Sequence, residues 1–342
     1  MSIKKIDVET LNAWVDGLIQ KQKVVGIQAK SDRFAFGPLS KAAELRLDYD
    51  VSILPPKSFF QPPRETVLTF NTGVGYESVI DSEPFVLLGV HPYDMTAIVQ
   101  LDQIFSQTSS DIHYMTRRRH ATIVVADVQA VSPNVFAGCM GTSYLEDGYD
   151  VLLTKIGDDY IVDAKTGKGE ALMPALADAP DASESWLEQR KLVWEHNRQR
   201  LRKHELKADP SRWPDLLEHA YDHPIWEEKA RLCFSCGSCN LVCPTCYCFD
   251  VRDDVNWDLS SGERVRTWDG CMLSGFAIVA GNLNFRKGAT ARYRHRYYRK
   301  GRYVPAKIAG QIACVGCGRC ITACVPNIAN PVEVFNRLTE GN

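Results

Sequence analysis

Eight cysteines near the C-terminus form two runs of the same spacing. Each run reads C-x2-C-x2-C-x3-C, with Pro244 directly after the first run and Pro326 shortly after the second. This spacing wraps a short loop around a cubane iron-sulfur cluster. Paired C-x2-C units also make zinc sites, but zinc gives no reason for a third cysteine at the same step, twice over. The sequence therefore predicts two [4Fe-4S] clusters. The runs are Cys233, Cys236, Cys239 and Cys243, and Cys314, Cys317, Cys320 and Cys324.

The two ligand sets are predicted to be crossed. Three thiolates of one tight loop can point at one cluster, whereas the fourth is displaced by a turn, lies close to a proline and is directed at the neighbouring cluster. Cys324 would therefore complete the first cluster, with Cys233, Cys236 and Cys239. Cys243 would complete the second, with Cys314, Cys317 and Cys320.

Three further cysteines lie between the runs, at Cys246, Cys248 and Cys271. They are candidates for part of a third metal site, which could be a third iron-sulfur cluster and needs one more ligand. Cys139 is the only other cysteine. The alternative is that the three thiols are small buried side chains packed around the clusters. Cys243 and Cys246 also match a redox C-x2-C, but Cys243 is already assigned to a cluster.

A stretch from Gly270 to Val332 contains no acidic residue but many basic ones, although the net charge of the whole chain is only −2. Positive charge near an anionic cluster favours its reduced form and attracts an acidic partner, so we expect charge tuning and docking here. One alternative is that these basic side chains form a surface exposed to solvent. Another is a nucleic-acid-binding surface, which the tyrosines between the basic residues favour only weakly. The basic residues are Arg286, Lys287, Arg292, Arg294, Arg296, Arg299, Lys300, Arg302, Lys307 and Arg319.

The 342 residues are sufficient for two or three domains, and the hydrophobic content of 45% is ordinary for a folded protein. The N-terminus lacks a hydrophobic signal region and the apolar runs are too short to cross a bilayer, so we expect a cytoplasmic protein with no transmembrane segment. The 12 cysteines without a secretion signal favour metal over disulfides. No hydrolytic or phosphoryl-transfer motif is present, and Gly73-Val-Gly75 is predicted to be a hairpin turn.

The elements that position the cysteines are predicted from periodicity. Alternating strands and helices indicate an N-terminal α/β domain. The duplicated cysteine run indicates a ferredoxin-like dicluster domain with a long insertion between its two cluster-binding halves. The predicted fold class is therefore α+β multidomain. Predicted strands are 24–29, 34–36, 67–70, 85–90, 121–126, 149–154 and 160–163, and predicted helices are 7–20, 93–105 and 183–206. Predicted domains are 1–182 (docking), 183–225 (helical linker) and 226–342 (two clusters), with the insertion at 249–312.

Several strings resemble the 4Fe-4S dicluster family, which includes sulfhydrogenase beta subunits and one of the subunits of anaerobic sulfite reductases. The similarity is dense from about 230 to 326 and looser upstream. Relatives commonly have a cysteine in place of Tyr93, and Cys-Phe-Cys in place of Val135-Phe-Ala137. The matching strings are 233–251, 262–264, 267–272, 284–286, 292–296 and 314–320, with shorter upstream matches at 88–94, 101–102, 114–118 and 140–142.

This resemblance implies an iron-sulfur electron-transfer subunit of a cytoplasmic multi-subunit redox complex in anaerobic metabolism. Its partners would be a flavoprotein that handles NAD(P)H, which would hold the flavin, and a catalytic subunit of hydrogenase, sulfite or sulfur reductase, or heterodisulfide-reductase type. We expect no catalytic residues in this chain. One alternative is a self-sufficient reductase that acts on a small sulfur compound at the additional cysteines. Another is a scaffold whose clusters are purely structural.

Overall fold

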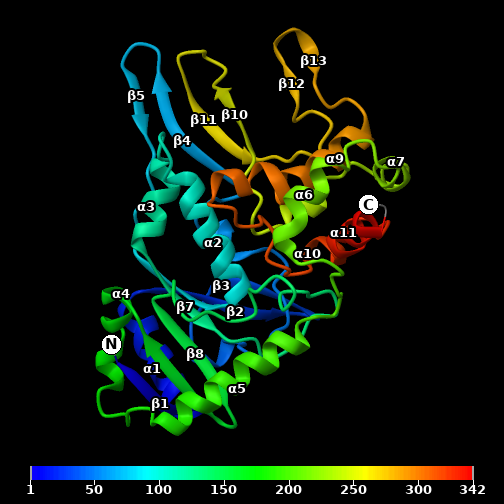
Figure 1. Cartoon of the computed structure of the whole chain (residues 1–342). Helices are drawn as coiled ribbons and strands as arrows, with labels where there is room; N and C mark the ends of the chain where they lie inside the picture. Colours follow the sequence, from blue (N-terminus) through cyan, green and yellow to red (C-terminus); the bar gives the residue numbers. More distant parts are fainter. Residues whose placement is uncertain (1, 341–342) are drawn as a thin grey trace.

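A seven-stranded mixed sheet forms the base of the molecule in the computed structural model, which describes residues 2–340 (Figure 1). The strand order is β1-β9-β8-β7-β6-β2-β3. The central strands β2, β6, β7 and β8 pair in parallel, and the outer strands pair antiparallel. Their bounds are β1 Ile3–Asp7, β2 Lys23–Lys30, β3 Arg33–Pro38, β6 Phe85–Val90, β7 Ala121–Ala126, β8 Val151–Ile156 and β9 Asp159–Ala164.

Helices cover both faces of this sheet because its central strands are apolar on both sides. Every residue of β6 is buried, as expected for a parallel strand between two helical layers. One core packs α1 against the sheet and the other packs α2, α3 and α5. The Asp7 side chain caps α1 by accepting from the Thr10 amide at 2.8 Å. The bounds are α1 Val8–Lys21, α2 Pro92–Phe105, α3 Ile112–His120, α4 Gly167–Glu170 and α5 Glu184–Arg200.

The helix predicted over 183–206 ends at Arg200 instead. The chain beyond it pairs with the loop that precedes Cys139, since the Lys203 amide donates to the Val135 carbonyl and the Gly138 amide donates to the Leu201 carbonyl. These backbone bonds replace the last helical turns. They also hold the 135–138 loop in place beside the second cysteine run.

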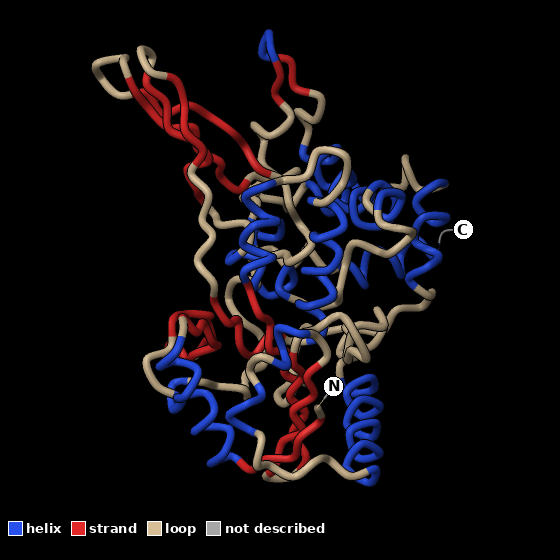
Figure 2. Tube along the Cα trace, turned by 90° about the vertical axis from the view of Figure 1, so that its left-hand side faces the viewer, coloured by secondary structure: helices blue, strands red, loops and turns tan. Residues whose placement is uncertain are grey.

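A four-stranded sheet, which we call the β-arm, projects from the body (Figure 2). Its order is β10-β11-β4-β5, so the insertion between the cysteine runs pairs with a much earlier hairpin. The predicted turn at Gly73–Gly75 is confirmed, because it joins β4 to β5. A buried ion-pair network, in which Arg266 and Arg117 share Glu65, ties the arm to α3. The bounds are β4 Arg64–Asn71, β5 Gly75–Ser78, β10 Phe249–Val255 and β11 Ser261–Trp268.

Short helices surround the cysteine runs and share an aromatic core. Trp213 stacks on Phe335 with ring centroids 3.6 Å apart, and Trp226 lies against Tyr297. The bounds are α6 Trp213–Glu218, α7 Ile225–Ala230, α8 Ser238–Leu241, β12 Ile278–Val279, β13 Leu283–Asn284, α9 Ala289–Tyr298, α10 Arg319–Thr322 and α11 Pro331–Glu340. Short 3-10 turns lie at Ala42–Glu44, Pro56–Phe59, Met173–Leu176, Pro210–Arg212, Ala280–Asn282 and Pro305–Lys307, and a π turn at Arg299–Tyr303.

This arrangement confirms the predicted fold class, a mixed α and β protein whose cysteine-rich part follows a larger N-terminal domain. The predicted domain boundaries stay predictions. Among the helices of residues 2–340, none combines the length and the apolar character that a bilayer span requires.

Candidate metal centres

The first cavity is lined by Cys233, Cys236 and Cys239 together with Cys324 of the second run. About 350 Å³ of it is not filled by atoms. Gly237 adopts a φ of 74° directly before α8, a left-handed conformation that glycine takes without strain. This turn lets the loop direct three thiols to one side.

The second cavity repeats the design with Cys314, Cys317 and Cys320, and Cys243 of the first run completes its lining. It has about 290 Å³ of space not filled by atoms. Gly318, with a φ of 77°, precedes α10 as Gly237 precedes α8. The sequence duplication is therefore also a duplication of the backbone.

The structure thus brings the eight cysteines together in two quartets, each of three thiols from one run and one from the other. Tetrahedral closure of a cubane by three loop thiolates and one distant thiolate needs this grouping. Within residues 2–340, no three or more His, Cys, Asp or Glu side chains are close enough together to hold a single metal ion. The assignment of each thiol to a cluster stays a prediction that iron analysis can test.

The second loop is anchored to the N-terminal domain through a buried ion pair. Arg319 donates to both oxygens of Asp94 at 2.6 Å, and also to the Ser52 carbonyl and hydroxyl at 2.9 Å. Arg319 is 3% exposed and Asp94 is fully buried. Gly316 lies so close to Ala137 that a Cβ would approach its amide nitrogen to 2.6 Å. The loop therefore rests directly on the N-terminal domain.

Four of the ten basic residues in the acid-free stretch are buried, so a solvated face does not describe them. Lys300 donates to the Cys243 sulfur at 3.0 Å. Arg296 is 1% exposed, and none of its three guanidinium nitrogens has a hydrogen-bond partner within residues 2–340. Burying a guanidinium without a counterion costs free energy, so a negative charge near Arg296 would stabilise the protein. The four are Arg292, Arg296, Lys300 and Arg319.

Burial of Cys239 and Cys314 disfavours their free thiolates. Burial raises the pKa of Cys239 to about 12 and that of Cys314 to about 11. A thiol of such high pKa is protonated at neutral pH, so the thiolate that ligates iron must be stabilised by the metal and by the buried cations.

The three additional cysteines line a third cavity with about 360 Å³ of space not filled by atoms. Cys246 and Cys248 come from the segment after the first run, and Cys271 follows β11. Lys300 and Thr245 line this cavity and the second one, so the two are adjacent. Cys139 lies elsewhere, with its thiol 3.4 Å from the His204 carbonyl.

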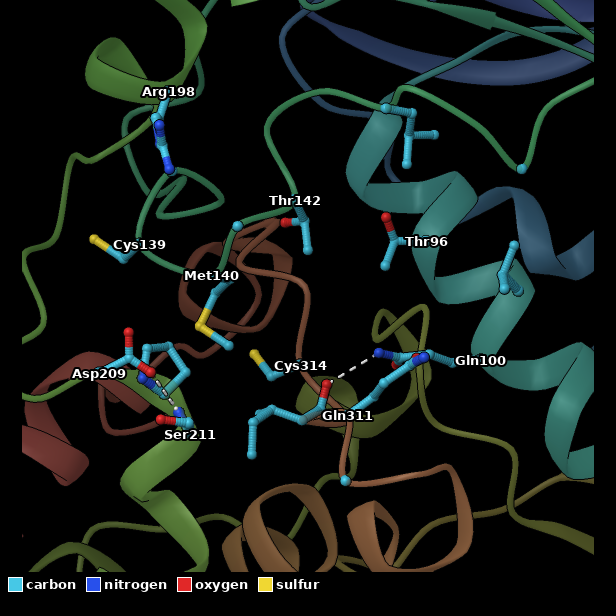
Figure 3. Close-up of a pocket in the computed structure, with 18 of the residues that line it drawn as sticks. Thr96, Gln100, Cys139, Met140, Thr142, Arg198, Asp209, Ser211, Gln311 and Cys314 are labelled. Carbon is cyan, nitrogen blue, oxygen red and sulfur yellow. Dashed lines mark hydrogen bonds between the residues drawn. The ribbon is translucent and has the colours of Figure 1, made fainter. Parts of the chain in front are cut away.

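A large cleft of about 1440 Å³, partly open to solvent, borders the second cysteine set (Figure 3). It lies between α2, the 138–148 loop and the segments 209–211 and 310–314. In Figure 3 the Cys314 sulfur lies at its centre, between Met140 and Gln311. Gln100 of α2 donates to the Ile312 carbonyl at 3.1 Å and holds the two walls together. The second set therefore has a route to the surface at Cys314.

Sequence reasoning missed several polar residues that contact the cysteines. Lys57, in the short 3-10 turn Pro56–Phe59, is buried, donates to the Cys246 carbonyl and lies 4.4 Å from the Trp268 ring centroid. Asn240 is buried between the sulfurs of Cys246 and Cys271. No spacing rule points to Lys57. Asn240 lies inside the first cysteine run, between Cys239 and Cys243, and this position in the sequence could have indicated that it contacts the cysteines.

Comparison with known proteins agrees with this geometry. Residues 232–328 match the model of the 4Fe-4S dicluster domain family. The sulfhydrogenase 2 subunit beta of Pyrococcus furiosus is 32% identical over 345 residues, an alignment that covers all of this chain and 99% of that protein. The match extends through the N-terminal domain as well as the cysteine runs.

The C-terminal part of this chain is therefore a domain for two [4Fe-4S] clusters, and the protein is an iron-sulfur protein of the electron-transfer class. The chain belongs to the family of sulfhydrogenase beta subunits.

Proposed function

We propose that this chain relays electrons through its two clusters between a flavoprotein subunit that handles NAD(P)H and a catalytic subunit. The catalytic subunit would be of hydrogenase, sulfite or sulfur reductase, or heterodisulfide-reductase type. The grouping of the thiols carries this proposal: each loop supplies three thiols to the lining of one cavity and one thiol to the lining of the other, as crossed ligation would require. Such sharing holds two clusters side by side.

The clusters would be held by the two quartets, and the chain's own contribution is position, burial and charge. Bound there, each cluster supplies one-electron redox chemistry. Arg296 and Lys300 place buried positive charge next to these thiols, which supports the view that the chain tunes the clusters.

The two cavities reach the surface at different places, which supports a relay with two ends. The first cavity includes Cys236, an exposed cysteine, and is flanked by Phe234 and Val325, which are 67% and 79% exposed. The second reaches the large cleft at Cys314. One partner would dock on the apolar surface around Cys236 and another at the cleft.

The self-sufficient reductase would need a small substrate to reach the additional cysteines. Cys271 is only 5% exposed, and Cys246 and Cys248 are partly buried and share the lining of their cavity with three basic side chains. The burial of these three cysteines favours the electron relay over the self-sufficient reductase.

The experiment is anaerobic reconstitution of the full chain with iron and sulfide, followed by iron analysis, redox-titrated EPR and co-purification with subunit identification. We expect at least about eight iron atoms per chain, reducible cubane signals and recovery of a flavoprotein with a second redox subunit. A zinc-loaded protein without a reducible signal would overturn the proposal. Turnover of a sulfur compound by the isolated chain would favour the reductase instead.

A further inference from the structure

The base of the β-arm brings four ligand-type residues together from two adjacent chain segments. β10 and β11 end their ladder at the pair Phe249 and Trp268, and the Asp269 amide continues it by donating to the Cys248 carbonyl at 3.1 Å. Cys246 lies two residues before Cys248, and Cys271 lies two residues after Asp269. Both pairs line the same cavity, so the two segments face one site.

We propose that this site binds a third [4Fe-4S] cluster, ligated by the thiolates of Cys246, Cys248 and Cys271 and by the Asp269 carboxylate. The inference rests on the proposed function in that it assumes an iron-sulfur protein. All four residues line the third cavity, and its 360 Å³ of unfilled space matches the 290 and 350 Å³ of the two cysteine quartets.

The amide of Asn240 supports this site from the protein side. Its nitrogen lies 3.6 Å from the Cys246 sulfur and 3.5 Å from the Cys271 sulfur. Its oxygen accepts from the Met272 amide at 3.1 Å, which fixes the orientation of the side chain. An amide N–H directed at two ligand sulfurs is the kind of hydrogen bond that tunes an iron-sulfur cluster.

Charge around the cavity provides an independent observation. Arg296, Arg299 and Lys300 line it, and the buried Lys57 contacts the backbone of Cys246. Asp269 is the only acidic residue among those that line the cavity. With neutral thiols the cations have little to balance them, and the buried guanidinium of Arg296 has no hydrogen-bond partner in the described part of the chain.

A cubane in this ligand set satisfies the charge and the hydrogen-bond donors together. With three thiolates and one carboxylate, an oxidised cluster carries about two negative charges, and its sulfides accept hydrogen bonds. Arg296 is also close enough to Cys239 and Cys320 to interact electrostatically with the first two sets. The same side chain would therefore face three anionic groups.

The carboxylate ligand gives the third cluster a chemical signature of its own. A carboxylate is a harder and weaker ligand for a thiophilic iron site than a thiolate, so the iron atom held by Asp269 is the one most easily lost. Loss of that atom as Fe²⁺ leaves a reduced three-iron cluster, and an added one-electron oxidant such as ferricyanide converts this cluster to its oxidised form, which has a distinct EPR signal. Asp269→Cys would supply a fourth thiolate and secure the iron.

The test is iron and sulfide analysis with EPR on the anaerobically reconstituted full chain. We expect about twelve iron atoms per chain in the native protein and about eight in Cys271→Ala or Cys248→Ala. Cys139→Ala is the matched control, since Cys139 lies outside the third cavity, and it should keep about twelve. After treatment with the one-electron oxidant, Asp269→Ala should show the three-iron signal, whereas Asp269→Cys should not show it.

A native count of about eight, with the signals of two cubanes, would overturn the third site while leaving the two-cluster relay intact. Absence of any cubane signal would instead overturn the proposed function. An unchanged EPR spectrum in Asp269→Ala would remove Asp269 from the ligand set.

Discussion

The two cysteine loops share one backbone but sit in opposite surroundings. The first loop lies at the surface, where Cys236 is exposed and the Ser238 hydroxyl, 3.3 Å from its sulfur, lowers its pKa. In the second loop, Cys317 and Cys320 are 7% and 8% exposed, and burial raises the pKa of Cys317 to about 12. The same motif is therefore exposed at the surface in the first loop and buried in the interior in the second loop.

What distinguishes the loops is their contact with the N-terminal domain. Gly318 packs on the backbone of Asn134, whereas Gly237 packs on the side chain of Leu273. Arg319 reaches Asp94 across 225 residues of sequence, whereas the Ser238 hydroxyl, at the equivalent position, lies 3.3 Å from the Cys236 sulfur of its own loop. A duplicated motif thus becomes asymmetric through its neighbours, which suits a relay with two different ends.

The largest expected effect is that of Gly318→Ala. A Cβ there would lie 2.3 Å from the Asn134 carbonyl oxygen, and the backbone has a positive φ, so we expect a loss of about 4 kcal/mol or more in stability. Gly237→Ala meets a movable Leu273 side chain at 2.8 Å and should cost about 1–3 kcal/mol. Denaturant unfolding of both reconstituted variants measures the difference. Equal losses of stability in Gly318→Ala and Gly237→Ala would contradict the claim that only the second loop packs on the backbone of the N-terminal domain.

Arg319→Met should cost about 3–5 kcal/mol, because it leaves the Asp94 carboxylate buried without its partner. Ser238→Ala, the matched change in the first loop, should cost no more than about 0.5 kcal/mol. Thermal unfolding of the two proteins provides the measurement. Adding Asp94→Leu to Arg319→Met should recover part of the loss, and failure to do so would show that the ion pair is not the cause.

Oxidative damage should separate the loops in time. The first cluster should be lost before the second on limited exposure to air, because only its loop has an exposed cysteine. EPR of samples reduced after timed exposure follows the two signals. Simultaneous loss of the two clusters would contradict the prediction that exposure of the first loop makes its cluster more sensitive to air. Earlier loss of the cluster bound by the second loop would show the opposite order of sensitivity.

A smaller effect is expected from Arg296→Met, which should lower the cluster potentials by on the order of 60 mV, a tenfold change in the one-electron equilibrium. Removing a buried cation disfavours the extra negative charge of the reduced state. Redox titration monitored by EPR tests this. Arg294→Met, on the same helix but outside the cavities, is the control. A shift confined to one cluster would assign Arg296 to that loop alone.

Short-range patterns in the sequence were sufficient to predict the cysteine runs and the central strands. Cysteine spacing predicts the loops because ligands three residues apart act within a single turn. The continuous apolar run at β6 predicts a buried strand for a similarly local reason.

Long-range partners were not predictable from spacing. Nothing near Arg319 indicates Asp94, and nothing near Cys246 indicates Lys57. The strand β10 was missed because almost all of its side chains are exposed, so it lacks an apolar face. Helix α5 ends early because its last residues prefer backbone bonds to the 135–138 loop, a choice made by tertiary structure.

The most direct test of the crossed pair of clusters is the iron content of two double variants. Cys239→Ala/Cys324→Ala removes two thiols from the first cavity, so it should lose one cluster, about four iron atoms. Cys239→Ala/Cys243→Ala removes one thiol from each cavity and should disturb both clusters, with a loss of about eight. The reverse result, about eight for the first variant and about four for the second, would contradict crossed ligation.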